Sequence, residues 1–153
     1  MELDDYDKQL LRLLQNDGKM SAKDLAAAVN LSLSPCWRRI RRLEKGGAIK
    51  GYTALLDRKQ LGFHAQAYLH ISLVDHSIET IASFDQLVQF EDRIIECASI
   101  TGEDDYIIKV VARDPEDLER FIMERILRGG MVRSSKTNFV LSNKKTGAKL
   151  SVT

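Results

Sequence analysis

Four arginines stand within five consecutive positions, 38–42, directly after the only tryptophan, Trp37. Guanidinium groups at this density bind polyanions, because each one carries a permanent charge and donates hydrogen bonds to phosphate oxygens. The formal net charge of the whole chain is only +1, yet residues 34–50 contain six basic side chains and one acidic side chain. A local excess of this kind is typical of an element that binds nucleic acid.

The segments around the arginines predict a helix-turn-helix. Residues 3–18 have helical apolar spacing, with acids in the first turn, and a second short helix follows Ser21 as its N-cap. Ser34 is predicted to cap the third helix, with Pro35 at its first position and the glycines at 46–47 ending it. Three short helices with a basic third one predict a domain that places this helix in the major groove of DNA.

The third helix has an inner and an outer face at 100° per residue. Cys36, Ile40 and Leu43 share the predicted buried stripe. Trp37 and Arg39 lie on the flanks, where Arg39 can equally pair with an acid of the first helix and Trp37 can simply cover an exposed edge. The predicted DNA-binding residues are Ser32, Ser34, Trp37, Arg38, Arg39, Arg41, Arg42 and Lys45.

Two kinds of DNA contact are expected on this face. Arg38 and Arg41 are predicted to reach base edges, and Arg42 and Lys45 to contact phosphates. The alternative is a small helical bundle whose arginines only keep it soluble. A solvated face normally mixes charges of both signs, and here Glu44 is the single acid, so DNA binding is favoured.

The rest of the chain predicts an α+β sandwich. Residues 49–57 read as a strand, followed by a connector. The later segments give the order strand, helix, strand, strand, helix, strand, which is that of a ferredoxin-like βαββαβ fold with both helices on one face. The predicted domains are 1–62, a helix-turn-helix with its connecting strand and linker, and 63–153. The predicted later elements are strands at 64–74, 94–100, 105–112 and 131–142, and helices at 77–90 and 115–129, the last after Asp114 as N-cap.

One face of this sheet has no helix over it. It carries Tyr68 and, depending on the register of the third strand, either Tyr106 or Ile107. A partly apolar face favours a homodimer, which suits a helix-turn-helix because two recognition helices about 34 Å apart read successive major-groove turns.

Other function classes find little support. Cys36 and Cys97 lie in different predicted modules without metal-ligand spacing, so neither a disulfide nor a zinc site is expected. The three histidines and the acids at 103–105 have no nucleophile pattern or phosphate-binding glycine loop beside them, so no catalytic residue and no enzyme activity are predicted. There is no long apolar run and no basic-then-apolar start, so a cytosolic protein without a membrane partner is expected.

Four segments together resemble one protein family over essentially the whole chain. They are LDDYDKQLLRLLQNDG, LSLSPCWRRIRRLEKGGAIKGYTALLD, ECASITGEDDYIIKV and TNFVL. The sequence resembles the Lrp/AsnC (feast/famine) transcriptional regulators of bacteria and archaea. The resemblance implies a winged-type helix-turn-helix that binds double-stranded DNA, a C-terminal amino-acid-sensing and oligomerisation (RAM) domain, dimers that commonly assemble into octamers, a nucleoid-associated location, and transcription controlled by a small effector, with no other cofactor.

The acids at 103–105 lie in a predicted hairpin turn and suggest where an effector binds. A turn needs only polarity, whereas adjacent carboxylates repel one another, so this cluster suggests a cationic partner such as an α-ammonium group. The Gly-x-x-Asp-Tyr motif of the family falls on Gly102, Asp105 and Tyr106, and the resemblance implies an amino acid, neutral or basic, held around this turn between dimers. Asp104 or Asp105 is expected to accept the ammonium, Thr101 and Gly102 to bind the carboxylate, and Thr137 and Asn138 to wall the pocket.

A further alternative remains at the level of sequence. A nucleoid-like architectural protein would bind DNA with little sequence choice and without a ligand.

Overall fold

A computed structural model describes residues 2–147 and 149–153, which form two compact units. Unit 1 comprises Met1–Leu55 and Lys145–Thr153, and unit 2 comprises Leu56–Lys144. The predicted division lay between residues 62 and 63 and assigned the C-terminus to the second domain. In the structure the last residues join unit 1 instead, because they are hydrogen-bonded to its first helix.

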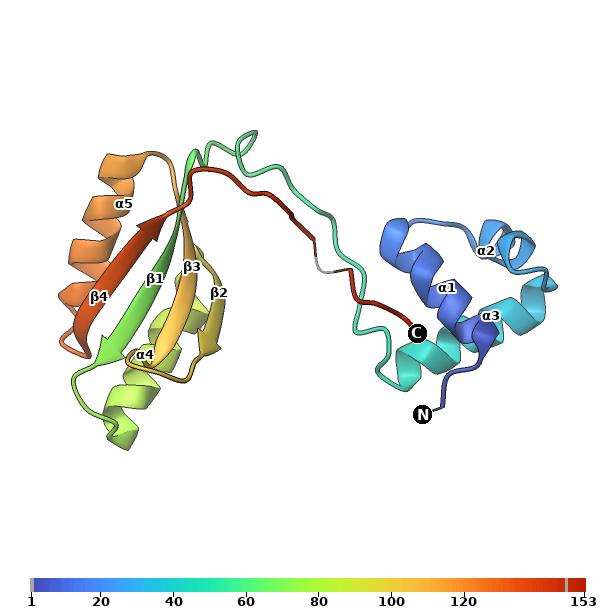
Figure 1. The fold of residues 1–153 in the computed structure, drawn as a ribbon, viewed down its shortest axis with the longest axis horizontal. Coiled ribbons are helices and arrows are strands. Elements are labelled where there is room, and N and C mark those ends of the chain that lie inside the picture. Colours follow the sequence, from blue (N-terminus) through green and yellow to red (C-terminus); the bar gives the residue numbers. More distant parts are fainter. Residues whose placement is uncertain (1, 148) are drawn as a thin grey trace. The chain divides into compact units, whose positions relative to one another are not determined.

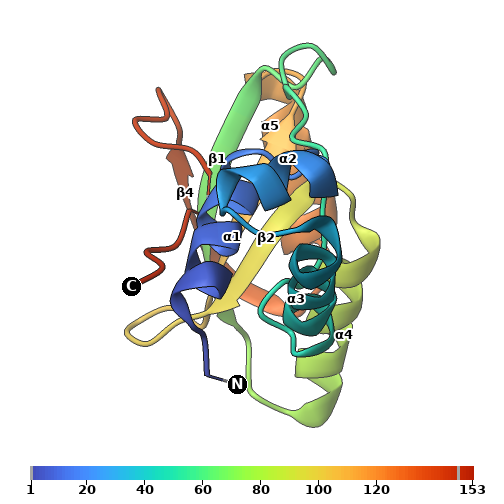
Figure 2. The same ribbon diagram turned by 90° about the vertical axis from the view of Figure 1, so that its right-hand side faces the viewer.

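Unit 1 contains the three predicted helices, coloured blue to cyan in Figures 1 and 2: α1 (Asp5–Asn16), α2 (Ala22–Ala28) and α3 (Leu33–Lys45). Asp4 caps α1 in a capping box with Asp7, and the Ser21 hydroxyl accepts the Asp24 N–H at the start of α2. The stripe predicted for α3 is buried in a core with α1 and α2. Its best-buried members are Leu10, Leu25, Cys36 and Leu43.

The start of α3 differs from the prediction. Ser32 and not Ser34 is the N-cap residue, so Pro35 lies inside the first turn and not at its first position. The Ser32 side chain makes no capping hydrogen bond. Proline is tolerated throughout the first turn, where no N–H has an intrahelical partner, so Pro35 did not determine where the helix begins.

The strand predicted over 49–57 is not formed. Residues 50–56 form no backbone hydrogen bond within the described part of the chain. Their apolar side chains are not packed either, since Leu55 is 90% exposed and Leu56 is 72% exposed. A β-strand requires a neighbour for its N–H and C=O groups. The segment is therefore extended but has no partner strand among the described residues.

Unit 2 has the predicted βαββαβ order. The strands β1 (Ala65–Leu73), β2 (Ile94–Ser99), β3 (Tyr106–Ala112) and β4 (Val132–Phe139) form one antiparallel sheet in the order β2-β3-β1-β4. The helices are α4 (Ile78–Phe90) and α5 (Pro115–Phe121), and α5 continues as a π-helical segment, η1 (Ile122–Leu127). Asp114 caps α5 with Pro115 in its first turn, as predicted. Figure 1 shows this sheet with its helices.

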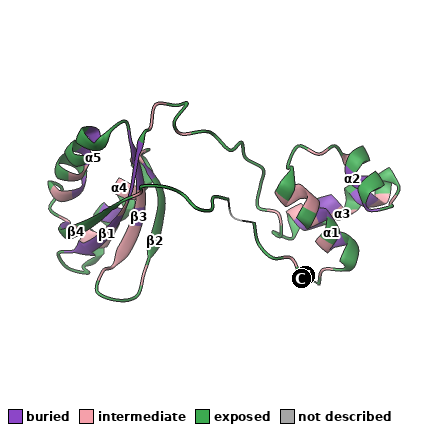
Figure 3. Cartoon of the chain, turned by 45° about the horizontal axis from the view of Figure 1, so that its top comes forward, coloured by how far each residue is buried: buried purple, intermediate pink, exposed green. Residues whose placement is uncertain are grey.

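The register of β1 and β3 assigns the two faces of the sheet. Leu69 and Ile71 point into a core that includes Phe84 of α4 and Phe121 of α5. Tyr106 is opposite Ile71 on this helix-covered side and its ring lies 4.5 Å from that of Phe84. Ile107 therefore belongs to the uncovered face, together with Tyr68, and this resolves the two predicted registers. The edge strands β2 and β4 are largely exposed (Figure 3).

The chain returns to unit 1 at its C-terminus. Arg12 Nε and Nη2 donate to the carbonyl oxygen of Val152 at 3.1 and 2.6 Å. Gln15 exchanges two hydrogen bonds with the backbone of Leu150, at 3.1 and 2.7 Å, and Lys149 Nζ donates to Asn16. Residues 149–153, which we call the C-terminal tail, therefore lie along α1.

Both cysteines are free thiols, Cys36 buried and Cys97 exposed, and burial raises the pKa of Cys36. Within the described residues, every helix is too short or too polar to cross a membrane.

Candidate nucleic-acid interface and effector turn

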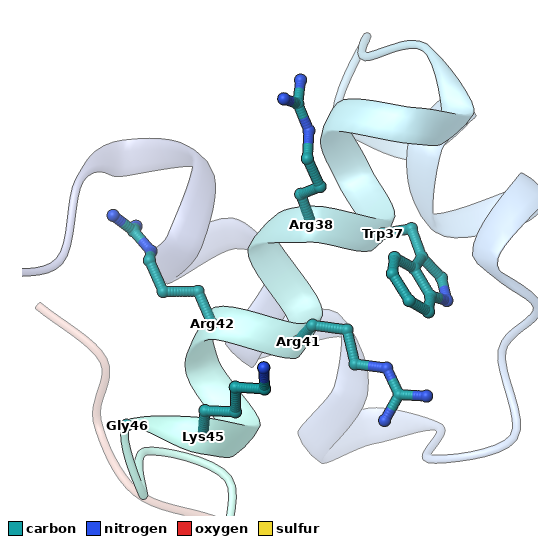
Figure 4. A pocket seen from close by; sticks show the side chains of 6 residues that line it. All are labelled: Trp37, Arg38, Arg41, Arg42, Lys45 and Gly46. Carbon is teal, nitrogen blue, oxygen red and sulfur yellow. The ribbon is translucent and has the colours of Figure 1, made fainter.

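The outer surface of α3 forms a shallow, open hollow with a basic lining (Figure 4). Helix geometry places residues three and four apart on one face, so the spacing of the arginines brings their side chains together. The hollow has a volume of about 580 Å³ and is lined by Trp37, Arg38, Arg41, Arg42, Lys45 and Gly46. The structure thus places five of the predicted DNA-binding residues around one concave surface.

Trp37 and Arg41 form a stacked pair on this surface. The Arg41 guanidinium lies 4.8 Å from the Trp37 ring centroid, and Trp37 is 50% exposed. Arg41 Nη1 also lies 3.4 Å from a Glu44 carboxylate oxygen, and the other Glu44 oxygen accepts a hydrogen bond from the Tyr52 hydroxyl at 3.2 Å. The pair presents an aromatic plane and a cation to the same partner.

Arg39 and Arg42 are turned toward α1. The buried Asp7 carboxylate accepts hydrogen bonds from Arg39 Nη1 at 3.0 Å and from Arg42 Nη2. Arg39 also pairs with Asp4 at 2.5 Å, which lowers the pKa of Asp4 after the larger effect of the Asp7 backbone N–H. Of the two roles left open for Arg39, the structure shows the pairing with acids of α1, and Arg42 shares Asp7 instead of pointing freely outward.

Arg38 and Lys45 have a different environment. In the part of the chain that the structure describes, neither side chain forms an ion pair, and both are exposed. Ser32 and Ser34 are also exposed at the start of α3, and their hydroxyls donate to no described group. These four side chains are free to meet a ligand.

Sequence reasoning did not identify Asp7 as part of this surface. Its signal was present in two matching spacings: Asp4 and Asp7 are separated by three positions, as are Arg39 and Arg42. Two acids on one helix turn can meet two arginines on one turn of another helix, but only the packing of α1 on α3 shows that they do.

The predicted effector turn joins β2 to β3. Its exposed residues are Thr101, Gly102 and Glu103, and Gly102 has a positive φ of 124°, which favours glycine. Asp104 is less exposed and points along the uncovered face of the sheet. Its carboxylate accepts a hydrogen bond from the Ser72 hydroxyl at 2.9 Å.

Two basic groups also approach Asp104. His70 Nδ1 lies 3.5 Å away and Lys136 Nζ lies 3.8 Å away. The predicted set did not include Lys136, whose position in β4 has no sequence signal apart from its charge. Asp104 thus already faces donors from two strands.

Asp105 ties the turn to the end of β1. Its carboxylate accepts the Leu73 N–H at 2.8 Å, and its other oxygen lies 2.7 Å from His76 Nε2. The Leu73 N–H lowers the pKa of Asp105 most, and His76 lowers it further. Asp105 therefore has a structural role in addition to any contact with a ligand.

Three predicted effector residues do not join the turn. Tyr106 packs beneath it against Phe84. Thr137 is opposite Leu69, four residues along β1 from Leu73, which at 3.3 Å per residue is roughly 13 Å. Asn138, one position further, points to the opposite face. Within one chain the register separates Thr137 and Asn138 from Asp105.

The described residues contain no group of three or more histidine, cysteine, aspartate or glutamate side chains arranged to hold a metal ion.

Comparison with known proteins finds one family in the N-terminal part of the chain and another in the C-terminal part. Residues 3–50 match the winged helix-turn-helix DNA-binding family, and residues 66–150 match the Lrp/AsnC ligand binding domain. The chain is 40% identical over 124 residues to the transcriptional regulatory protein DoeX of Halomonas elongata, covering 81% of this chain and 78% of DoeX. It is 34% identical to the leucine-responsive regulatory protein of Escherichia coli, covering 97% and 91% of the two chains.

Solved structures agree in fold. A transcriptional regulator from Neisseria meningitidis in complex with L-methionine has a TM-score of 0.94 at 29% identity, covering 98% of this chain and 97% of that one. An AsnC family regulator from Agrobacterium tumefaciens has a TM-score of 0.90 at 31% identity, covering 97% of both chains. With both family matches in sequence, the basic outer face of α3 and the βαββαβ sheet in their expected places, the chain belongs to the Lrp/AsnC family of transcriptional regulators.

Proposed function

We propose that this chain is a sequence-specific transcriptional regulator whose DNA binding or assembly responds to a free amino acid. The observation that supports this most directly is the concave basic surface of α3, a helix of the size that fits a major groove. Duplex DNA carries about one negative charge per 1.7 Å of axis, so a local cluster of guanidinium groups matches it even in a nearly neutral protein.

We assign two kinds of contact on this surface. Arg38 and Arg41 reach base edges, because they lie on the outer face and are not bound to α1. Lys45 and the hydroxyls of Ser32 and Ser34 contact phosphates near the two ends of the helix. Trp37, stacked on Arg41, limits how that guanidinium can move.

The protein would act as a dimer, and the dimers would assemble further. Among the described residues, no helix of the chain covers the sheet face with Tyr68 and Ile107, and the extended segment 50–56, with exposed Leu55, has no backbone hydrogen-bond partner. A second copy can supply both. An octamer would have a mass of about 140 kDa, eight times the 17.3 kDa of one chain.

The effector is proposed to bind at the turn 101–105. Thr101 and Gly102 offer exposed hydroxyl and backbone groups, and Asp104 offers a carboxylate. The L-methionine complex of the Neisseria meningitidis regulator supports an amino acid as the ligand class. Because Thr137 and Asn138 are remote from this turn within one chain, a pocket containing all of these residues requires a second copy.

Three measurements test this function. Selection of binding sites from a random duplex library should yield a consensus, whereas enrichment without a consensus would indicate an architectural DNA-binding protein. Thermal-shift screening of the twenty amino acids should identify the effector, since a ligand at a hundred times its dissociation constant adds about 2.7 kcal/mol of stability.

Light scattering completes the set by reporting mass with and without that amino acid. A monomer that still binds its consensus tightly would exclude the proposed dimer. Titration of Thr101→Ala with the identified amino acid tests the site, and unchanged affinity would place it elsewhere.

A further inference from the structure

Asp7 is the one acidic side chain in contact with two arginines of α3 in the described residues. It lies in the first turn of α1 and its side chain is 0% exposed. Oδ1 accepts from Arg39 Nη1, while Oδ2 accepts from Arg42 Nη2 and from the backbone N–H of Asp4. Removing a carboxylate from water in this way is costly unless cations and hydrogen-bond donors compensate it.

This contact divides the arginine cluster into two pairs. Arg39 and Arg42 are three positions apart on α3 and face α1, where Asp4 and Asp7 offset their charges. Arg38 and Arg41 make no contact with α1. Two of the six basic side chains in residues 34–50 are therefore paired with acids of the same chain, although the Arg42 side chain stays half-exposed.

The division of the arginines into two pairs matters because contacts with phosphates and contacts with bases affect the affinity for DNA differently. Each phosphate that is neutralised raises affinity for every sequence and makes binding more sensitive to salt. Base contacts raise affinity for the correct sequence alone. A protein that keeps arginines away from phosphates therefore has a lower affinity for every duplex and binds with less sensitivity to salt.

We infer that Asp7 is a positioning residue that sets how strongly DNA binding depends on salt: it holds Arg39 and Arg42 against α1 and so withholds both cations from the DNA backbone. This inference rests on the proposed DNA-binding function, and it replaces the expectation that Arg42 contacts a phosphate. Asp7 touches no DNA itself and acts through the two guanidinium groups.

The test is the salt dependence of binding by the full-length Asp7→Asn variant. Asparagine keeps the shape and can still accept the Asp4 N–H, but it has no charge with which to hold two arginines. For a random duplex, the slope of log affinity against log salt should steepen by up to about 1.8, or about 0.9 for each released arginine. Between about 50 mM and about 200 mM salt this corresponds to an additional loss of up to about twelve-fold.

The selected site provides the second readout. The slope should steepen on this site as it does on the random duplex, and the ratio of the two affinities should change little, because the released arginines strengthen binding to both duplexes. A merely structural role would weaken binding to both without steepening the slope.

Asp5→Asn is the matched control. It removes the same charge from the same turn of α1, at an exposed side chain that forms no ion pair in the described structure. Asp5→Asn should leave the slope and the ratio unchanged. The triple variant Asp7→Asn, Arg39→Gln, Arg42→Gln should return the slope to the wild-type value.

The outcomes separate the two proposals. If the wild type binds no DNA, the proposed function fails. If the wild type binds and folded Asp7→Asn keeps the wild-type slope, the inference about Asp7 is overturned. If Asp7→Asn does not fold, Arg42→Gln in the otherwise wild-type chain is the second variant, in which Arg39 still pairs with Asp7. The inference expects it to keep the wild-type slope, because Arg42 is already withheld from phosphates, and a slope reduced by about 0.9 overturns the inference.

Discussion

The Arg41 guanidinium lies over the Trp37 ring at 4.8 Å, on the exposed surface of the helix that carries the DNA-binding residues. Trp37 is the only tryptophan, so its emission reports on unit 1 and on this surface. We expect saturation with duplex DNA to change its fluorescence, because a bound duplex desolvates the ring or displaces Arg41. Fluorescence titration of the wild type and of Arg41→Ala with duplex DNA measures this change. An emission that stays constant at saturation would show that the DNA interface does not include this surface of α3.

Alanine variants of the outer arginines should separate base contacts from phosphate contacts. Arg38→Ala or Arg41→Ala should each cost about 1 to 3 kcal/mol on the selected site and relax its consensus. Lys45→Ala should weaken all duplexes alike and reduce the salt slope by about 0.9.

Arg128→Ala serves as the control for these variants, since it removes an exposed charge from unit 2. Binding measured by anisotropy on selected and random duplexes distinguishes the cases. Equal losses on both duplexes for all three α3 variants would contradict the assignment of base contacts.

Acid should weaken unit 2 through Asp105. Folding lowers the pKa of this carboxyl, chiefly through the Leu73 N–H and then through His76, so its stabilising effect is present above the ordinary aspartate pKa and disappears as pH falls through the lowered value. Asp105→Asn should therefore be less stable than wild type at pH 7, by about 1 kcal/mol for a partly exposed charged acceptor. The difference should shrink as the pH falls below the ordinary aspartate pKa towards the lowered value.

Urea denaturation followed by far-UV circular dichroism between pH 7 and pH 3 measures this difference. Asp92→Asn is the matched control, because Asp92 is exposed and forms no ion pair in the described structure. A deficit of Asp105→Asn that stays constant over the whole range would show that charge is not its cause.

Removal of the C-terminal tail should destabilise unit 1. The tail makes five hydrogen bonds to α1, all of them exposed, and their gain is partly offset by the entropy of ordering the tail. Deletion of residues 149–153 should cost about 1 kcal/mol, measured by Trp37 fluorescence in thermal unfolding.

Gln15→Ala should reproduce part of this loss, whereas Gln9→Ala, an exposed glutamine elsewhere on α1, should not. Equal melting temperatures for wild type and the truncated chain would show that the tail adds nothing to unit 1.

Much of the fold follows from local pattern. Helical spacing placed α1 and α3, strict alternation placed β1 with Leu69 and Ile71 inward, and Asp114 with Pro115 marked the start of α5. These predictions are correct because each one depends on residues close together in the chain.

The predictions differ from the structure where a conformation depends on residues far away in the sequence. Residues 49–57 read as a strand, but no neighbouring strand among the described residues pairs with 50–56. The direction of Arg42 depends on Asp7, and the remoteness of Thr137 from Asp105 depends on the register of β4 against β1. Charge spacing located the basic surface, whereas the pairing within it required the packed structure.

The return of the C-terminal tail to α1 also fixes an order of events during synthesis. The core of unit 1 lies within the first 49 residues, so α1, α2 and α3 can pack as soon as these have left the ribosome. The contacts of Arg12 and Gln15 with the tail span 140 and 135 positions of the chain. They can form only after all of unit 2 has been made, so a nascent DNA-binding unit exists for most of translation without the last segment that lies along α1.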